Sequence, residues 1–167
     1  ERVESFAYDN MGNMTARTLC SGETITYEYD LINRMTKKTL PGDPSEATDY
    51  VYDDLGRMTS VTDGNGTIAY VFDDANRVLS VTFPDDTILA YEYDVVGNRT
   101  KITYSDESYV EYTYDDLNRM DQVIDQAENV LADYSYDAVR RTGLEYLNET
   151  SVSYEYNDAG WVTALFN

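Results

Sequence analysis

Residues 50–59 read Tyr50-Val51-Tyr52-Asp53-Asp54-Leu55-Gly56-Arg57-Met58-Thr59, and this stretch holds the clearest structural signal in the sequence. Before the first Asp, aromatic residues alternate with a smaller residue, which is the period-two pattern of a β-strand with one buried face. The Asp and the Gly three residues later are typical of a tight turn, because a carboxylate accepts backbone hydrogen bonds and Gly tolerates positive φ. The stretch therefore predicts a β-hairpin that begins with an aromatic strand.

An aromatic residue followed by Asp or Asn recurs eight times along the 167 residues. The anchor pairs are Tyr8-Asp9, Tyr29-Asp30, Tyr52-Asp53, Phe72-Asp73, Tyr93-Asp94, Tyr114-Asp115, Tyr136-Asp137 and Tyr156-Asn157. Successive anchors are 21, 23, 20, 21, 21, 22 and 20 residues apart, which lies within the range of known repeat architectures. A period kept over eight copies predicts a single tandem array over residues 1–167.

The residues after each anchor predict the same turn in almost every copy. The aspartates that we expect to close the turn through backbone hydrogen bonds are Asp9, Asp30, Asp53, Asp73, Asp94, Asp115 and Asp137. Four residues after the anchor aromatic stand Gly12, Asn33, Gly56, Asn76, Gly97, Asn118 and Gly160, and these two residue types tolerate positive φ best. Repeat seven has Arg140 at this position and is predicted to turn differently.

The second strand of each hairpin has a less regular pattern. Met58 and Val61 are three residues apart, so strict alternation would place them on opposite faces. A β-bulge or a strong twist would bring both to one face, and the sequence does not distinguish the two. The polar stretches at residues 40–46, 63–66, 84–86 and 105–107 are interpreted as longer loops between hairpins.

The predicted fold is all-β, with eight tandem β-hairpin repeats of about 21 residues winding as a solenoid-like spiral sheet. An isolated hairpin is marginal in water, so each repeat is expected to bury its tyrosine face against its neighbours. Each Tyr hydroxyl then needs a partner, and rings are expected to stack between repeats. The arginines five residues after an anchor are expected to meet carboxylates in a polar ladder along the array: Arg34, Arg57, Arg77 and Arg119.

The unit Tyr-x-Tyr-Asp-x-x-Gly/Asn-Arg resembles the YD repeat of RHS proteins over essentially the whole chain, most closely at residues 50–59 and 112–120. Proteins with this repeat include large bacterial surface or secreted proteins, shell subunits of insecticidal toxin complexes and the extracellular teneurins. The resemblance implies a long spiral of hairpins and an extracellular or cell-surface location. Shell-forming members end in a self-cleaving signature near Asp-Pro-x-Gly. Here Asp43-Pro44-Ser45-Glu46 lacks the Gly and lies early in the array, so self-cleavage and encapsulation by this chain alone are not expected.

Composition and charge exclude several classes of function. The chain has 32 acidic and 12 basic residues, and its formal net charge of −20 disfavours nucleic acid and anionic membrane surfaces. No apolar run approaches the roughly 18 residues of a membrane helix, so no membrane insertion is predicted. With no His and one Cys, neither a Ser-His-Asp nor a Cys-His arrangement can form, and we predict that the protein is not an enzyme. Paired carboxylates such as Asp53-Asp54 recur with the repeat and are interpreted as turn residues.

Weaker signals concern ligands. Asp63 and Asn65 are calcium candidates, but their segment lacks the spacing of an EF-hand loop, so a solvated turn is favoured and no metal or cofactor is predicted. Four Asn-x-Thr sequons begin at Asn13, Asn65, Asn98 and Asn148, although Asn and Thr are already frequent in the repeat. Tyrosine faces also stack on sugars, but packing between repeats is favoured for most of them.

The sequence thus predicts a non-enzymatic structural protein of the cell surface or secreted space, which builds a shell, stalk or fibre by stacking hairpins. Neither terminal repeat shows a polar cap, so the expected partners are adjacent repeats of the same or a longer chain, with end-to-end self-assembly as one form. The alternative is a carbohydrate- or protein-binding repeat module, which would leave aromatic side chains exposed in a row.

Overall fold

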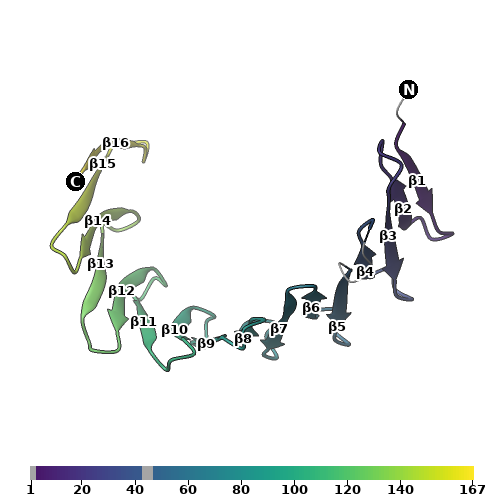
Figure 1. Ribbon diagram of the computed structural model, residues 1–167. Coiled ribbons are helices and arrows are strands. Elements are labelled where there is room, and N and C mark those ends of the chain that lie inside the picture. Colours follow the sequence, from purple (N-terminus) through teal and green to yellow (C-terminus); the bar gives the residue numbers. More distant parts are fainter. Residues whose placement is uncertain (1–2, 43–46) are drawn as a thin grey trace. The chain divides into compact units, whose positions relative to one another are not determined.

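The computed structural model describes residues 3–42 and 47–167, and the regular secondary structure of these residues is all β-strand (Figure 1). The strands are β1 (Ser5–Tyr8), β2 (Met14–Thr18), β3 (Thr24–Tyr29), β4 (Met35–Thr39), β5 (Thr48–Tyr52), β6 (Met58–Asp63), β7 (Gly66–Phe72), β8 (Val78–Thr82), β9 (Ile88–Tyr93), β10 (Arg99–Thr103), β11 (Tyr109–Tyr114), β12 (Met120–Asp125), β13 (Val130–Tyr136), β14 (Arg141–Tyr146), β15 (Ser151–Tyr156) and β16 (Val162–Phe166). The all-β hairpin array is therefore confirmed. In the described part, no helix is long and apolar enough to cross a membrane. The stretch 43–46, which holds the Asp-Pro pair, lies outside the described residues.

The chain divides into two compact units, Glu1–Ile88 and Leu89–Asn167, with the boundary at the start of β9. Within each unit the strands follow one another in chain order, each antiparallel to the next. A meander of this kind needs only hairpin connections. In each unit, the turns that follow the anchors consequently lie at one end of the strands, and the turns that connect hairpins lie at the opposite end.

Alternation gives the first strand of each hairpin an aromatic face and a polar face. In β3, Ile25, Tyr27 and Tyr29 are half-buried, whereas Thr26 and Glu28 between them are exposed. The same alternation of burial appears in β5 and β15. Tyr, Val, Ile and Thr suit such a pleated, half-buried surface, so local preference and burial agree.

A β-bulge at the anchor aromatic explains the irregular second strands. Tyr52 pairs with Met58 while Tyr50 pairs with Val61, so β6 has one residue more than β5 between these pairs. Directly opposite residues share a face, and the bulge therefore brings Met58 and Val61 onto the aromatic face. All eight hairpins shift register at the anchor, which confirms the bulge as the correct alternative.

The hydrophobic core is thin. Among the described residues, Ala47, Ala132 and Leu144 are the buried apolar residues, and no large side chain is fully buried. Neighbouring hairpins pair side by side in the same sheet, so each side chain is covered by those of the adjacent strands and not by a second layer. The expectation of a buried tyrosine face is therefore corrected, because the face is half-covered.

The connecting turns at residues 63–66, 84–86 and 105–107 are as short as the anchor turns, which corrects the prediction of longer loops there, whereas most of the predicted loop at 40–46 lies outside the described residues. The N–H of Tyr104 donates to Ser108 O (2.8 Å) and that of Glu107 donates to Tyr104 O (3.0 Å), as in the anchor turns. Asp63 and Gly66 are directly paired, so the turn between β6 and β7 has two residues. The connecting turns include acidic residues with positive φ, namely Asp86, Glu107, Glu128 and Glu149.

Candidate functional site: a ladder between repeats

Each anchor Asp closes its own turn. In the third repeat, Asp53 Oδ1 accepts the backbone N–H groups of Leu55 (3.0 Å) and Arg57 (2.9 Å). Its second oxygen, Oδ2, accepts Arg57 Nε at 2.7 Å, so one carboxylate holds both the turn and the arginine side chain. The contact with the N–H two residues on is repeated by Asp9, Asp30, Asp73, Asp94, Asp115, Asp137 and Asn157.

The turn then passes through one residue with positive φ. In seven repeats this residue is the one that stands four positions after the anchor aromatic: Gly12, Asn33, Gly56, Asn76, Gly97, Asn118 and Gly160. In repeat seven, the N–H of Asp137 donates to Arg140 O at 2.9 Å, and the turn is one residue shorter. Arg140 marks the position where repeat seven departs from the others.

The arginine reaches forward to the next repeat. From the third repeat, the Arg57 guanidinium donates to Asp73 O (2.8 Å) and to Asn76 Oδ1 (2.9 Å), and it lies 4.9 Å from the Phe72 ring centroid. The same arrangement joins Arg34 to Tyr52 (4.7 Å), Arg119 to Tyr136 (4.2 Å) and Arg140 to Tyr156 (4.7 Å). A guanidinium held over a ring face is attracted by the ring's quadrupole. Between repeats, the anchor rings thus meet guanidinium groups, whereas the Tyr70–Phe72 ring contact (6.4 Å) lies within one strand.

Asparagine makes a shorter version of the forward contact in two repeats. Asn13 Nδ2 donates to Asp9 Oδ2 (2.9 Å) and to Asn33 Oδ1 (2.7 Å) in the next turn. Asn98 Nδ2 joins Asp94 (2.9 Å) to Asn118 (3.2 Å) in the same way. Both asparagines begin sequons, and a glycan on either amide nitrogen would replace one of the two hydrogens that make these contacts.

The tyrosine reaches back to the previous repeat. Tyr52 OH donates to Met35 O at 2.8 Å, and Met35 is the bulge residue opposite the preceding anchor. The same bond joins Tyr29 to Met14 O (3.0 Å), Tyr114 to Arg99 O (2.9 Å), Tyr136 to Met120 O (2.7 Å) and Tyr156 to Arg141 O (2.7 Å). We call the forward contacts of the arginines and asparagines and the backward contacts of the tyrosines the ladder.

Electrostatics favours the ionised form of the anchor aspartates, which hold the arginines, and the protonated form of the tyrosines that reach back. The backbone N–H of Arg34, with its side chain, lowers the pKa of Asp30 against the opposing effect of burial. The side chain and then the backbone of Arg119 lower the pKa of Asp115. Burial raises the pKa of the Tyr136 hydroxyl, which therefore stays protonated and donates.

Nothing in this arrangement resembles a catalytic or metal centre. The chain has no His, and the anchor carboxylates are engaged in closing turns. Within residues 3–42 and 47–167, no three His, Cys, Asp or Glu side chains are grouped so that they could hold a metal ion. Asp63 and Asn65, the calcium candidates, lie at a tight turn in which Asp63 Oδ1 accepts the N–H of Asn65 at 2.8 Å.

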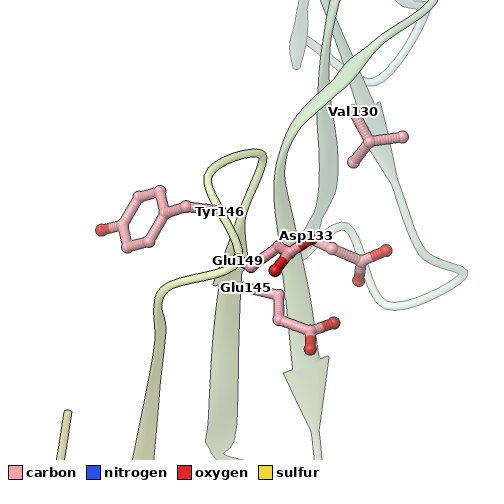
Figure 2. Close-up of a pocket in the computed structure, with 5 residues that line it drawn as sticks. All are labelled: Val130, Asp133, Glu145, Tyr146 and Glu149. Carbon is pink, nitrogen blue, oxygen red and sulfur yellow. The ribbon is translucent and has the colours of Figure 1, made fainter.

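A shallow hollow on the second unit gathers three carboxylates. Asp133 and Glu145 are directly paired across β13 and β14, and Glu149 lies in the turn that follows β14. Figure 2 shows the carboxylates of Asp133 and Glu145 pointing in different directions and the Tyr146 ring turned away from them. Gln122 Nε2 donates to Asp133 Oδ2 at 2.7 Å. The hollow therefore does not bring an acid–base pair or a chelating set together.

Comparison with known proteins gives two matching family models, RHS Repeat over residues 8–45 and Teneurin YD-shell over residues 43–125. Solved structures with the same fold include the TcdB2-TccC3-Cdc42 complex (TM-score 0.73, 17% identity) and a mutant Photorhabdus luminescens Tc holotoxin pore (TM-score 0.61, 18% identity). The matches cover 93% and 97% of this chain but 10% and 9% of those chains. No curated protein matches the sequence. The two family models and the shared fold point to a structural repeat.

Proposed function

The chain belongs to the RHS and YD-repeat family, and from this premise we propose that it is a non-enzymatic structural segment of the cell surface or secreted space. It builds a shell, stalk or fibre by stacking β-hairpins in one array. The observation that carries the proposal is the ladder, in which an arginine reaches forward and a tyrosine reaches back. Because every junction joins immediate neighbours, repeats of the same kind extend the array without a new type of contact.

The two terminal strands present the two halves of one further junction. β1 and β16 stand at the ends of the strand order, so among the described residues each pairs with a strand on one side only. Tyr8, an anchor of the kind that reaches back in other repeats, is 61% exposed. Trp161 occupies the position of the forward arginine and is 72% exposed. A repeat of the same or a longer chain, placed against either edge, would pair the strand and cover these rings.

Electron microscopy of the purified chain tests end-to-end stacking. Linear assemblies are expected for the unchanged chain, and they should be lost in Phe6→Asp, which adds a charge to the open edge of β1. Val51→Asp is the matched control, because Val51 is exposed to a similar extent (53% against 49%) but lies on β5, inside the array. Monomers at every concentration, or equal loss in both variants, would refute stacking through the terminal strands.

A carbohydrate-binding module is the weaker proposal. It requires aromatic side chains exposed in a row, but the tyrosines two residues before the anchors are half-buried: Tyr27, Tyr50, Tyr70, Tyr91, Tyr112, Tyr134 and Tyr154. A glycan array without hits would remove this alternative. Specific binding that is lost in Tyr112→Ala would instead establish it.

A further inference from the structure

Every anchor turn presents an apolar side chain to solvent at its tip, three residues after the anchor aromatic. The tips of the first unit are Met11, Ile32, Leu55 and Ala75, and those of the second unit are Val96, Leu117, Val139 and Ala159. The exposed fractions of the six larger side chains lie between 63% and 77%. The anchor turns of a unit all lie at the same ends of its hairpins, and we call this side of the sheet the anchor-turn edge. Each unit therefore carries a row of four apolar tips along its anchor-turn edge.

The backbone of the turn does not require an apolar tip. Five connecting turns have the same pair of backbone hydrogen bonds, for example Tyr104 N to Ser108 O and Glu107 N to Tyr104 O. Their tips are Ser21, Asp85, Asp106, Ala127 and Asn148, and four of these five side chains are polar. The two sets of turns have the same backbone hydrogen bonds but differ in the polarity of their tips. The apolar tips are therefore a property of the anchor turns and not a requirement of this turn geometry.

Charge and spacing narrow the kind of partner that would cover this row. Exposed carboxylates precede the tips at Asp54 and Asp74 in the first unit and at Asp116 and Asp158 in the second. A second copy of the edge would bring like charges together, whereas a cationic partner would be attracted. Two strands at 4.7–4.9 Å spacing place successive tips about 10 Å apart. A polyproline II segment presents the same face every three residues, or about 9.3 Å, which matches this pitch.

We propose that the anchor-turn edge is a docking site for a basic, amphipathic polypeptide segment of another protein in polyproline II conformation. Its apolar side chains, about 10 Å apart, contact the tips, and its Lys or Arg side chains meet the adjacent carboxylates. The proposal goes beyond the structural role, because it concerns the anchor-turn edge of each unit and not the junctions between repeats.

The test is fluorescence anisotropy of the full chain with a labelled peptide of four Leu-Lys-Pro triplets. A Ser-Lys-Pro peptide of equal charge should bind about tenfold more weakly or worse, because it lacks the apolar contacts. The tip variant Ile32→Asn, Leu55→Asn, Leu117→Asn, Val139→Asn should weaken the Leu-Lys-Pro peptide by a similar factor. The control variant Val51→Asn, Val71→Asn, at two side chains that are each 53% exposed on strands, should bind unchanged.

Two results would overturn the proposal. The first is equal binding of the two peptides, which would mean attraction by net charge alone, and the second is an unchanged affinity of the tip variant. If the second result comes with a changed oligomeric state of the tip variant, the row is a contact between copies. Circular dichroism shows whether the variants keep the fold. The tip variant should still form end-to-end assemblies, so failure here is distinguishable from failure of the structural proposal.

Discussion

The tyrosine half of the ladder has a phenylalanine at position 72, and changing it gives a sharp test. The Phe72 ring lies 4.9 Å from the Arg57 guanidinium, in the same arrangement as the Tyr52 ring has with its own arginine. Tyr52 donates its hydroxyl to Met35 O at 2.8 Å, whereas Phe72 has no hydroxyl to donate. By the repeat pattern, the acceptor for the hydroxyl that Phe72→Tyr adds is the carbonyl of Met58, the bulge residue of the preceding hairpin.

Phe72→Tyr should therefore stabilise the chain by one additional hydrogen bond, or about 1 kcal/mol. For a domain of this size, that raises the thermal unfolding midpoint by about 2–4 °C. Tyr52→Phe, the reverse change one repeat earlier, should lower the midpoint by a similar amount. Thermal and urea unfolding followed by circular dichroism measure both variants. If neither variant shifts the midpoint, the hydroxyl contacts contribute nothing to stability and the reasoning is refuted.

Three further predictions concern the arginine, the connecting turns and pH. Arg57→Lys keeps the charge but loses the planar fork that joins two turns, so the thermal midpoint should fall by a few degrees, and an unchanged midpoint would contradict the forward contact. Glu107 holds φ 66°, which costs a residue with a side chain about 1 kcal/mol, so Glu107→Gly should raise the urea midpoint and Gly97→Ala (φ 103°) should lower it. Hydrogen bonds lower the pKa of anchor carboxylates such as Asp30 in the folded chain, so folding favours the ionised form. The free energy of unfolding should then decrease as the pH falls below about 4, and a flat profile in an acid titration would count against this.

The anchor turns could be predicted from the sequence because their determinants are local. The Asx contact of Asp53 and the positive φ of Gly56 depend on residue types within one turn, and these types recur at a fixed spacing. The spacing of Met58 and Val61 likewise indicated that the second strand is irregular, but only the register shows that the irregularity is a bulge and not a strong twist.

The connecting turns could not be predicted because pairing of the flanking strands overrides residue preference. Asp86 and Glu107 adopt positive φ although neither is Gly or Asn, so the residue type that marks this position in the anchor turns is absent here. Alternation likewise predicts which face of a strand is apolar but not how many layers cover it. That is why the tyrosine face was expected to be buried and is half-covered.

The sequence predicted contacts between arginines and carboxylates. It did not predict the backward contacts of the tyrosines or the position of the arginines over the rings, because these contacts join different repeats. Tyr136 OH reaches Met120 O (2.7 Å) across 16 residues, and Met120 is the residue paired with the preceding anchor, Tyr114. Arg119 lies over the Tyr136 ring, whereas stacking of ring on ring was expected. A periodic sequence shows that such residues recur, but only the register shows which of them meet.

A double-mutant cycle on Arg119 and Tyr136 tests the central claim, that side chains of adjacent repeats hold the array together. This pair has the shortest guanidinium–ring distance of the anchor contacts described above, 4.2 Å. The cycle compares Arg119→Met, Tyr136→Leu and the double variant by urea unfolding. We predict a coupling free energy of at least about 0.5 kcal/mol, because each single change removes the same contact. Additive effects, with a coupling of zero within error, would contradict the claim.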